Sequence, residues 1–254
     1  MSSHRETPEL AGTVILAIIA AGAAVAGKIP LLILMVVLGV VAAGEQFRLA
    51  RSRGAHPLSF VGLVSIISLF VAAELKGERA PAAFGAVVAA AAGFAFLMAI
   101  VRRSRAGVTE GLMSTLVPVL VVGLLGGYIL AIRGIPHGLR LVLGFGAIAL
   151  LADIAIELAG TRAQIPRART GVALAGAIAG GVLCATVLHR AFTWGTAMIV
   201  AVLIGLVVAG TDPIASMLER ALSGRQKPAL MLRRIDGVLL SAPVFFYAYR
   251  ALAR

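Results

Sequence analysis

Long apolar segments follow one another along almost the whole chain, and they limit its fold more than any other feature. A helix needs about 20 predominantly apolar residues to cross the hydrocarbon core of a bilayer. The segments that approach this length are 10–27, 29–44, 58–73, 80–101, 112–132, 141–160, 171–188, 191–211 and 235–251. Helices satisfy their own backbone hydrogen bonds in lipid. We therefore predict an all-α fold, a polytopic integral membrane helical bundle of about nine transmembrane helices.

The composition agrees with a membrane protein. Of the 254 residues, 60% are hydrophobic and 13% are charged, and the mean hydropathy is +1.02. Soluble domains carry about 25% charged residues. The formal net charge of +12 would suggest nucleic acid as the partner of a soluble protein. Basic residues also collect in the cytoplasmic loops of membrane proteins, however, so we predict no nucleic-acid partner.

The remaining composition excludes some kinds of site. Cys184 is the single cysteine, so an internal disulfide and a cysteine-based metal site are excluded. The histidines are scattered without the spacing of metal ligands. Because no linker is long enough to separate domains, we predict a single transmembrane domain over residues 1–254. Its N-terminal helices would cover 10–132 and its C-terminal half 141–254.

The first segment has a second interpretation. Arg5, the apolar run and Ala24-Val25-Ala26 are similar to a secretory signal peptide. The acidic residues Glu6 and Glu9 argue against this interpretation. Both alternatives stay open at this point.

The arginines predict an orientation in the membrane. They are concentrated in the loops after the second, fourth, sixth and eighth segments and are sparse in the alternate loops. The positive-inside rule then places the N-terminus in the cytoplasm and the C-terminus outside the cell membrane. This orientation also puts the Tyr and Trp side chains near the outer interface, as in an aromatic belt.

Small residues and prolines predict local features of the helices. The pair Gly176-xxx-Gly180 lets two membrane helices approach closely, and we expect it to serve packing. Pro118 and Pro243 lie inside the fifth and ninth segments, where we expect them to kink the helices.

Four acidic residues lie in or at the ends of apolar segments, where an ionised carboxylate is costly: Asp153, Glu157, Asp212 and Asp236. The predicted topology brings all four to the cytoplasmic interface, close to several arginines. Carboxylates hold Mg²⁺ and arginines bind phosphate oxygens, so this set favours phosphoryl or nucleotidyl transfer. The alternative is that the carboxylates neutralise arginines whose role is topological.

Four short stretches stand in a fixed order near the C-terminus. They are 153-DIAIELAG-160, 166-PRART-170, 212-DPIASMLER-220 and 232-LRRIDGVLLSAPVFF-246. Each is similar to a motif of the CTP:phosphatidate cytidylyltransferases, also called CDP-diacylglycerol synthases. In the same order, these motifs are Asp-x-x-Ala-Tyr-x-x-Gly, Ser-Pro-Lys-Lys-Thr, Gly-Asp-Leu-x-x-Ser-x-x-Lys-Arg and Leu-Asp-Arg-x-Asp-Ser. Glu45, before 47-FRLARSRG-54, fits a weaker pattern of the same family.

The resemblance implies a membrane nucleotidyltransferase of phospholipid biosynthesis, often dimeric. With Mg²⁺ as cofactor, a phosphatidate phosphate would attack the α-phosphorus of CTP, giving CDP-diacylglycerol and pyrophosphate. By this resemblance Asp153, Asp212 and Asp236 would bind metal. The catalytic residues would be Ser216, Arg220 and Arg234. The nucleotide phosphates would be bound by Arg167, Arg169 and Thr170.

The chain also departs from the family pattern. Arg233 stands at an aspartate position, Glu219 replaces a lysine, and 170-TGVALAG-176 lacks a glutamate. The stretch 221-ALSGRQKPAL-230 is shorter than the family loop and lacks its aspartate and histidine. Two alternatives to an enzyme with a degraded site therefore stay open. One is an inactive homologue that binds anionic lipid or a partner protein, and the other is a transporter.

Overall fold

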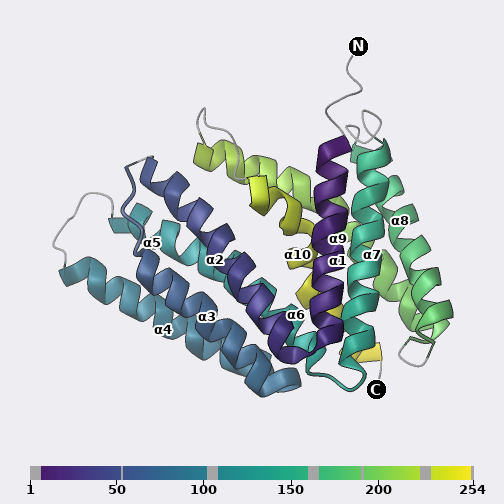
Figure 1. Cartoon of the computed structure of the whole chain (residues 1–254). Coiled ribbons are helices and arrows are strands. Elements are labelled where there is room, and N and C mark those ends of the chain that lie inside the picture. The colour runs from purple at the N-terminus through teal and green to yellow at the C-terminus, as the bar shows by residue number, and fades with distance from the viewer. Residues whose placement is uncertain are drawn as a thin grey trace, which may run out of the picture. The chain divides into compact units, whose positions relative to one another are not determined.

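The computed structural model describes residues 7–52, 54–101, 108–159, 166–189, 192–223 and 230–252. Within these ranges it does not describe the side chains of residues 7–11, 99, 108, 166–167, 212–223 and 230–236. All regular elements in the described ranges are helices, so the predicted all-α class is confirmed (Figure 1). The chain forms two compact units, Lys28–Pro136 and Met1–Gly27 with His137–Arg254.

The unit Lys28–Pro136 is built from consecutive helices. They are α2 (Lys28–Ser52), α3 (Ser59–Lys76), the 3₁₀ turn η1 (Gly77–Arg79), α4 (Ala80–Val101), α5 (Val108–Pro118), the π-helix η2 (Val119–Leu124) and α6 (Leu125–Arg133). The fully buried Phe70 ring fits against Gly39 of α2 and Gly126 of α6. The two glycines give this ring its space, since a Cβ on Gly39 would lie 2.7 Å from it.

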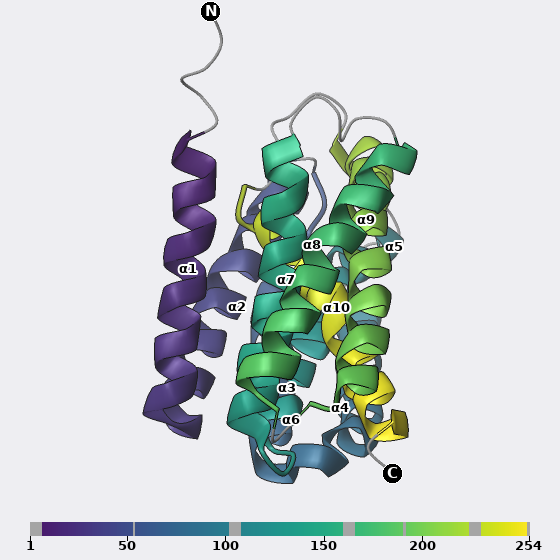
Figure 2. The same ribbon diagram turned by 90° about the vertical axis from the view of Figure 1, so that its right-hand side faces the viewer.

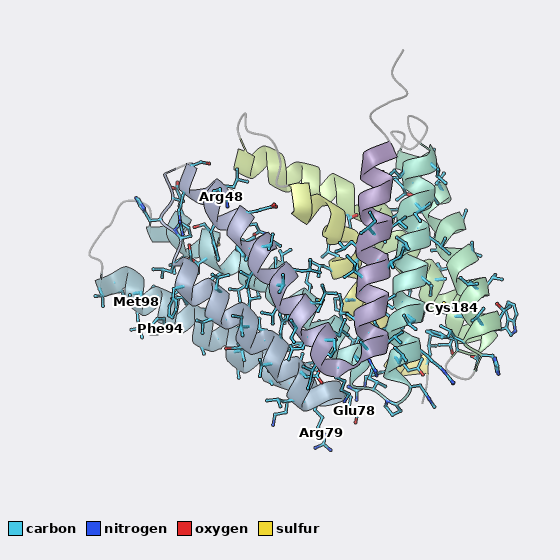
Figure 3. The ribbon with its side chains drawn as sticks, viewed as in Figure 1. Arg48, Glu78, Arg79, Phe94, Met98 and Cys184 are labelled. Carbon is cyan, nitrogen blue, oxygen red and sulfur yellow. The ribbon has the colours of Figure 1, made fainter. Side chains whose placement is uncertain are left out.

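Two turns of this unit meet through glycine backbones. Gly77 follows α3 with a positive φ of 52°, a conformation that glycine adopts at little cost. A Cβ on Gly134, after α6, would collide with the Gly77 Cα atom. Figure 3 shows Glu78 and Arg79 at this turn between α3 and α4, with Phe94 and Met98 near the other end of α4. The turn therefore packs against the end of α6 without side chains between them.

Pro118 changes the type of helix. The helix α5 ends at Pro118, and the π-helix η2 follows directly. Proline has no N–H to donate to the preceding turn, so the regular hydrogen-bond pattern cannot continue through it. We expected a kink here, and the structure has a π-helical segment, a rare form that occurs mostly inside α-helices. Pro243, by contrast, lies inside the continuous helix α10.

The second unit joins the first helix to the C-terminal ones. It contains α1 (Thr7–Ala26), α7 (Gly138–Ala159), α8 (Pro166–Val187), α9 (Trp194–Ser223) and α10 (Leu230–Leu252). The helices α7, α8, α9 and α10 pack in succession, and α1 packs against α7. The chain thus brings its first helix to the helices that carry the predicted site.

Close backbone contact holds α7, α8 and α9 together. A Cβ on Gly176 would collide with the Leu151 carbonyl oxygen, and one on Gly180 would lie 2.7 Å from the Ile148 Cα atom. The predicted role of Gly176-xxx-Gly180 in helix packing is therefore confirmed. Gly205 of α9 lies as close to Ala177 of α8, where an added Cβ would be 3.0 Å from the alanine Cβ.

The structure supports fewer membrane spans than we predicted. In the described ranges, six helices are long and apolar enough to cross a membrane. The prediction of about nine transmembrane helices is not supported. The third and fourth segments fall within one candidate span of 40 residues, Ser59–Met98, and the first and last helices have shorter apolar parts, Gly12–Ala26 and Gly237–Leu252. Large apolar side chains such as Phe60 and Ile18 are 80% and 65% exposed, as lipid-facing residues of a membrane protein are.

Candidate functional site

The ends of four helices lie at one end of the second unit (Figure 2). They are the C-terminal ends of α7 and α9 and the N-terminal ends of α8 and α10, because these helices alternate in direction. The C-terminal ends of α7 and α9 carry partial negative charge, which attracts cations. The N-terminal ends of α8 and α10 have free backbone N–H groups, which bind phosphate. This end of the unit is therefore suited to a ligand that combines a cation with phosphates.

The predicted residues occur at this end. Asp153 and Glu157 lie in the last two turns of α7, and Arg167, Arg169 and Thr170 lie in the first turns of α8. The backbones of Asp212, Ser216 and Arg220 belong to the C-terminal part of α9, and those of Arg234 and Asp236 to the first turns of α10. The side chains of Arg167, Asp212, Ser216, Arg220, Arg234 and Asp236 lie outside the described residues.

Gly237 marks the point where α7, α9 and α10 meet. A Cβ built on Gly237 would lie 3.4 Å from Asp153 Oδ1, 3.7 Å from Thr211 Oγ1 and 3.8 Å from Val208 Cγ1. Asp236 directly precedes Gly237, and Asp212 directly follows Thr211. The structure thus brings the backbone positions of Asp212 and Asp236 close to the carboxylate of Asp153.

Two buried hydroxyl groups lie close to Gly237. Thr211 is 6% exposed and donates to the Val208 carbonyl at 2.7 Å. Ser241 is fully buried and donates to the Gly237 carbonyl at 2.8 Å. Each hydroxyl uses its proton within its own helix. Of the two, only Thr211 is among the three atoms nearest to a Cβ on Gly237, and its oxygen lone pairs stay available to accept there.

Four predicted residues of α7 and α8 have described side chains. Asp153, Glu157, Arg169 and Thr170 are all half-buried. Each of them interacts with neighbouring groups. Since Asp153 and Glu157 are four residues apart in one helix, they lie on the same face. These side chains are half-buried at helix ends, so a charged ligand that arrives from the aqueous side could reach them.

The donor atoms at Gly237 fit Mg²⁺. Mg²⁺ prefers oxygen ligands and is usually held by one or two carboxylates together with waters and substrate phosphates. The Asp153 carboxylate and the Thr211 hydroxyl offer such oxygens beside the space that a side chain at position 237 would fill. Among the described residues, no group of three or more His, Cys, Asp or Glu could hold a metal.

The sequence did not point to Thr211 or Gly237. Neither residue is charged, although each is the direct neighbour of a predicted metal ligand. A glycine directly after an aspartate in the first turns of a helix is the sequence signal for this place.

A family model, described as the cytidylyltransferase family, matches residues 10–163. The chain belongs to the cytidylyltransferase family. The match contains Glu45, Asp153 and Glu157, whereas the three motifs after residue 163 lie outside it. No curated protein and no solved structure matches the chain.

Membership of the cytidylyltransferase family confirms the resemblance drawn from the sequence. It implies a membrane transferase of lipid biosynthesis, with CTP and phosphatidate as substrates and typically with Mg²⁺. The helical, apolar structure of this cytidylyltransferase-family protein agrees with a place in the membrane.

Proposed function

We propose that this protein is a phosphatidate cytidylyltransferase. A phosphate oxygen of phosphatidate forms a bond to the α-phosphorus of CTP, and the bond from that phosphorus to the bridging oxygen breaks. The products are CDP-diacylglycerol and pyrophosphate, so atoms and charge balance. The observation that carries the proposal is the meeting of Asp153 with the helix positions next to Asp212 and Asp236, at the Gly237 contact.

The roles of the residues follow from their chemistry. We assign Asp153, Asp212 and Asp236 to the metal, because carboxylate oxygens are its preferred protein ligands. Bound there, Mg²⁺ would neutralise phosphate charge and orient the reacting groups. Ser216, Arg220 and Arg234 are assigned to the reacting phosphates, and Arg167, Arg169 and Thr170 to the nucleotide phosphates. Arginine forks bind phosphate oxygens in pairs, which would fix their orientation.

The site of this protein is an altered one. Arg233 stands where the family pattern has an aspartate, which reverses the charge at one position. Glu157, one helical turn from Asp153, is the carboxylate best placed to compensate. The same substitution favours a second candidate function, an inactive homologue that binds anionic lipid through its arginines.

The orientation is part of the proposal. CTP is a cytoplasmic substrate, so we place the site end of the helices at the cytoplasmic face, with the N-terminus inside and the C-terminus outside. The arginine-rich loops support this placement. It is tested by reacting single cysteines, introduced at Glu78 or Ser223 in a Cys184→Ala background, with an impermeant thiol reagent on whole cells. Labelling at position 223 would contradict the placement, whereas we expect labelling at position 78.

The decisive experiment is synthesis of CDP-diacylglycerol. The purified protein is given labelled CTP, phosphatidate and Mg²⁺, and the labelled lipid is measured. We expect Asp153→Asn and the double variant Asp212→Asn with Asp236→Asn to lose about 100-fold or more. Loss of a metal carboxylate removes several kcal/mol of charge stabilisation.

A matched control is available in the other unit. Glu78→Gln makes the same acid-to-amide change at an exposed turn, and it should retain wild-type activity. A wild type that forms no more CDP-lipid than the double variant would refute the proposed function. If that protein still bound phosphatidate vesicles, the second candidate function would replace it.

A further inference from the structure

Thr211 is a buried polar residue to which the proposed mechanism assigns no role. Its hydroxyl oxygen lies 3.7 Å from the position of a Cβ on Gly237, and Asp153 Oδ1 lies 3.4 Å from the same position. Two atoms so close to one point border the same small space. Glycine at 237 puts no side chain of its own into that space.

The hydroxyl is oriented as an acceptor. Thr211 donates its proton to the Val208 carbonyl within α9, at 2.7 Å. The oxygen lone pairs therefore remain for another donor or a cation. Pro213, the second residue after Thr211 in α9, has no N–H to donate to the preceding turn. Figure 1 shows that the last part of α9 bends away from the rest of the helix.

We propose that Thr211 is a positioning residue of the cation site. Its oxygen accepts a hydrogen bond from a water bound to the divalent cation that Asp153 holds. Mg²⁺ gives up its waters reluctantly and usually keeps several of them in a protein site, and those waters need acceptors. Such outer partners orient the ligands and contribute to affinity. This inference rests on the proposed function, in that it takes Asp153 as a metal ligand.

The test measures cation binding without substrates. Mn²⁺ alone is titrated into the purified full chain in detergent, and free Mn²⁺ is followed by its electron paramagnetic resonance signal. We expect Thr211→Val, which keeps the shape and removes the oxygen, to raise the Kd for Mn²⁺ about 10-fold. Thr211→Ser should stay within about twofold of wild type, since it keeps the oxygen.

Ser241→Ala is the matched control. It removes a buried hydroxyl of α10 that is not among the three atoms nearest to a Cβ on Gly237, and it should leave Mn²⁺ binding unchanged. If Thr211→Val does not fold, Thr211→Ala replaces it. A folded Val or Ala variant that binds Mn²⁺ like the wild type overturns the inference, and so does a wild type that binds no Mn²⁺. Lack of CDP-lipid synthesis by the wild type would refute the proposed function but leaves the Mn²⁺ comparison valid, so the two failures are distinguishable.

Discussion

Replacing Gly237 by alanine should leave the protein as stable as before, or slightly more stable, and should weaken its binding of a cation. The new methyl group would lie 3.4 Å from Asp153 Oδ1, 3.7 Å from Thr211 Oγ1 and 3.8 Å from Val208 Cγ1. These are ordinary van der Waals distances, so we expect no clash. Alanine inside a helix is also about 0.5–1 kcal/mol more favourable than glycine. The free energy of unfolding should therefore stay the same or rise by about that amount.

The same methyl group should weaken cation binding. A water that donates to the Asp153 carboxylate would lie about 2.7–2.8 Å from the carboxylate oxygen. On the side of Gly237, this position falls within the volume that the methyl group would fill. A carbon atom there offers no lone pair. We expect the Kd for Mn²⁺ to rise about 10-fold or more, and CDP-diacylglycerol synthesis to fall with it.

The assay compares the variant with Gly146→Ala. Gly146 lies inside α7, and a Cβ there would meet no atom within 4 Å. This control should show the same gain in thermal stability and wild-type cation binding. A Gly237→Ala protein that is stable and binds Mn²⁺ like the control would refute the reasoning. So would a variant that unfolds, because the distances leave room for the methyl group.

Two further predictions concern packing, and both are measured by unfolding of the purified protein in detergent. Gly176→Ala should destabilise by about 1–3 kcal/mol, because its methyl group would meet the α7 backbone, while Gly171→Ala on the same helix meets no atom within 4 Å and should not. Thr115→Val should cost about 1–3 kcal/mol, because the buried Leu58 N–H donates to the threonine hydroxyl at 2.9 Å and would lose its acceptor. Thr186→Val, on an exposed helix surface, is its control; equal stability of either pair would contradict these contacts.

The sequence predicted the class of fold because apolar runs of this length have few alternatives in lipid. It did not predict the number of spans. The helices α3 and α4 follow each other through the short turn Gly77–Arg79 and fall in one candidate span, although the turn carries Glu78 and Arg79. The first and last helices have apolar parts shorter than a span. For Pro118 the sequence predicted a kink, and it did not predict the π-helix that follows this residue. Gly123 of this segment lies against Leu69 and Ile66 of α3, a contact that the sequence alone does not show.

For the site, charge and topology predicted which helix ends come together. That prediction depended on residues that are costly in a membrane, such as Asp153, and so are visible in a sequence. Thr211 and Gly237 carry no such signal. Their meaning comes from a contact between helices, and a sequence shows neither which residue faces a glycine nor how near it is.

The place of α1 has a consequence for biosynthesis. This helix packs against α7, yet the whole unit Lys28–Pro136 is synthesised between the two. Domains tend to fold as units, N-terminal parts first, while the chain is being made. The intervening unit therefore has all its own helices before α7 emerges, and α1 must remain without its partner until then. A ribosome-bound chain that stops at Pro136 would thus hold a complete middle unit and an unpaired first helix.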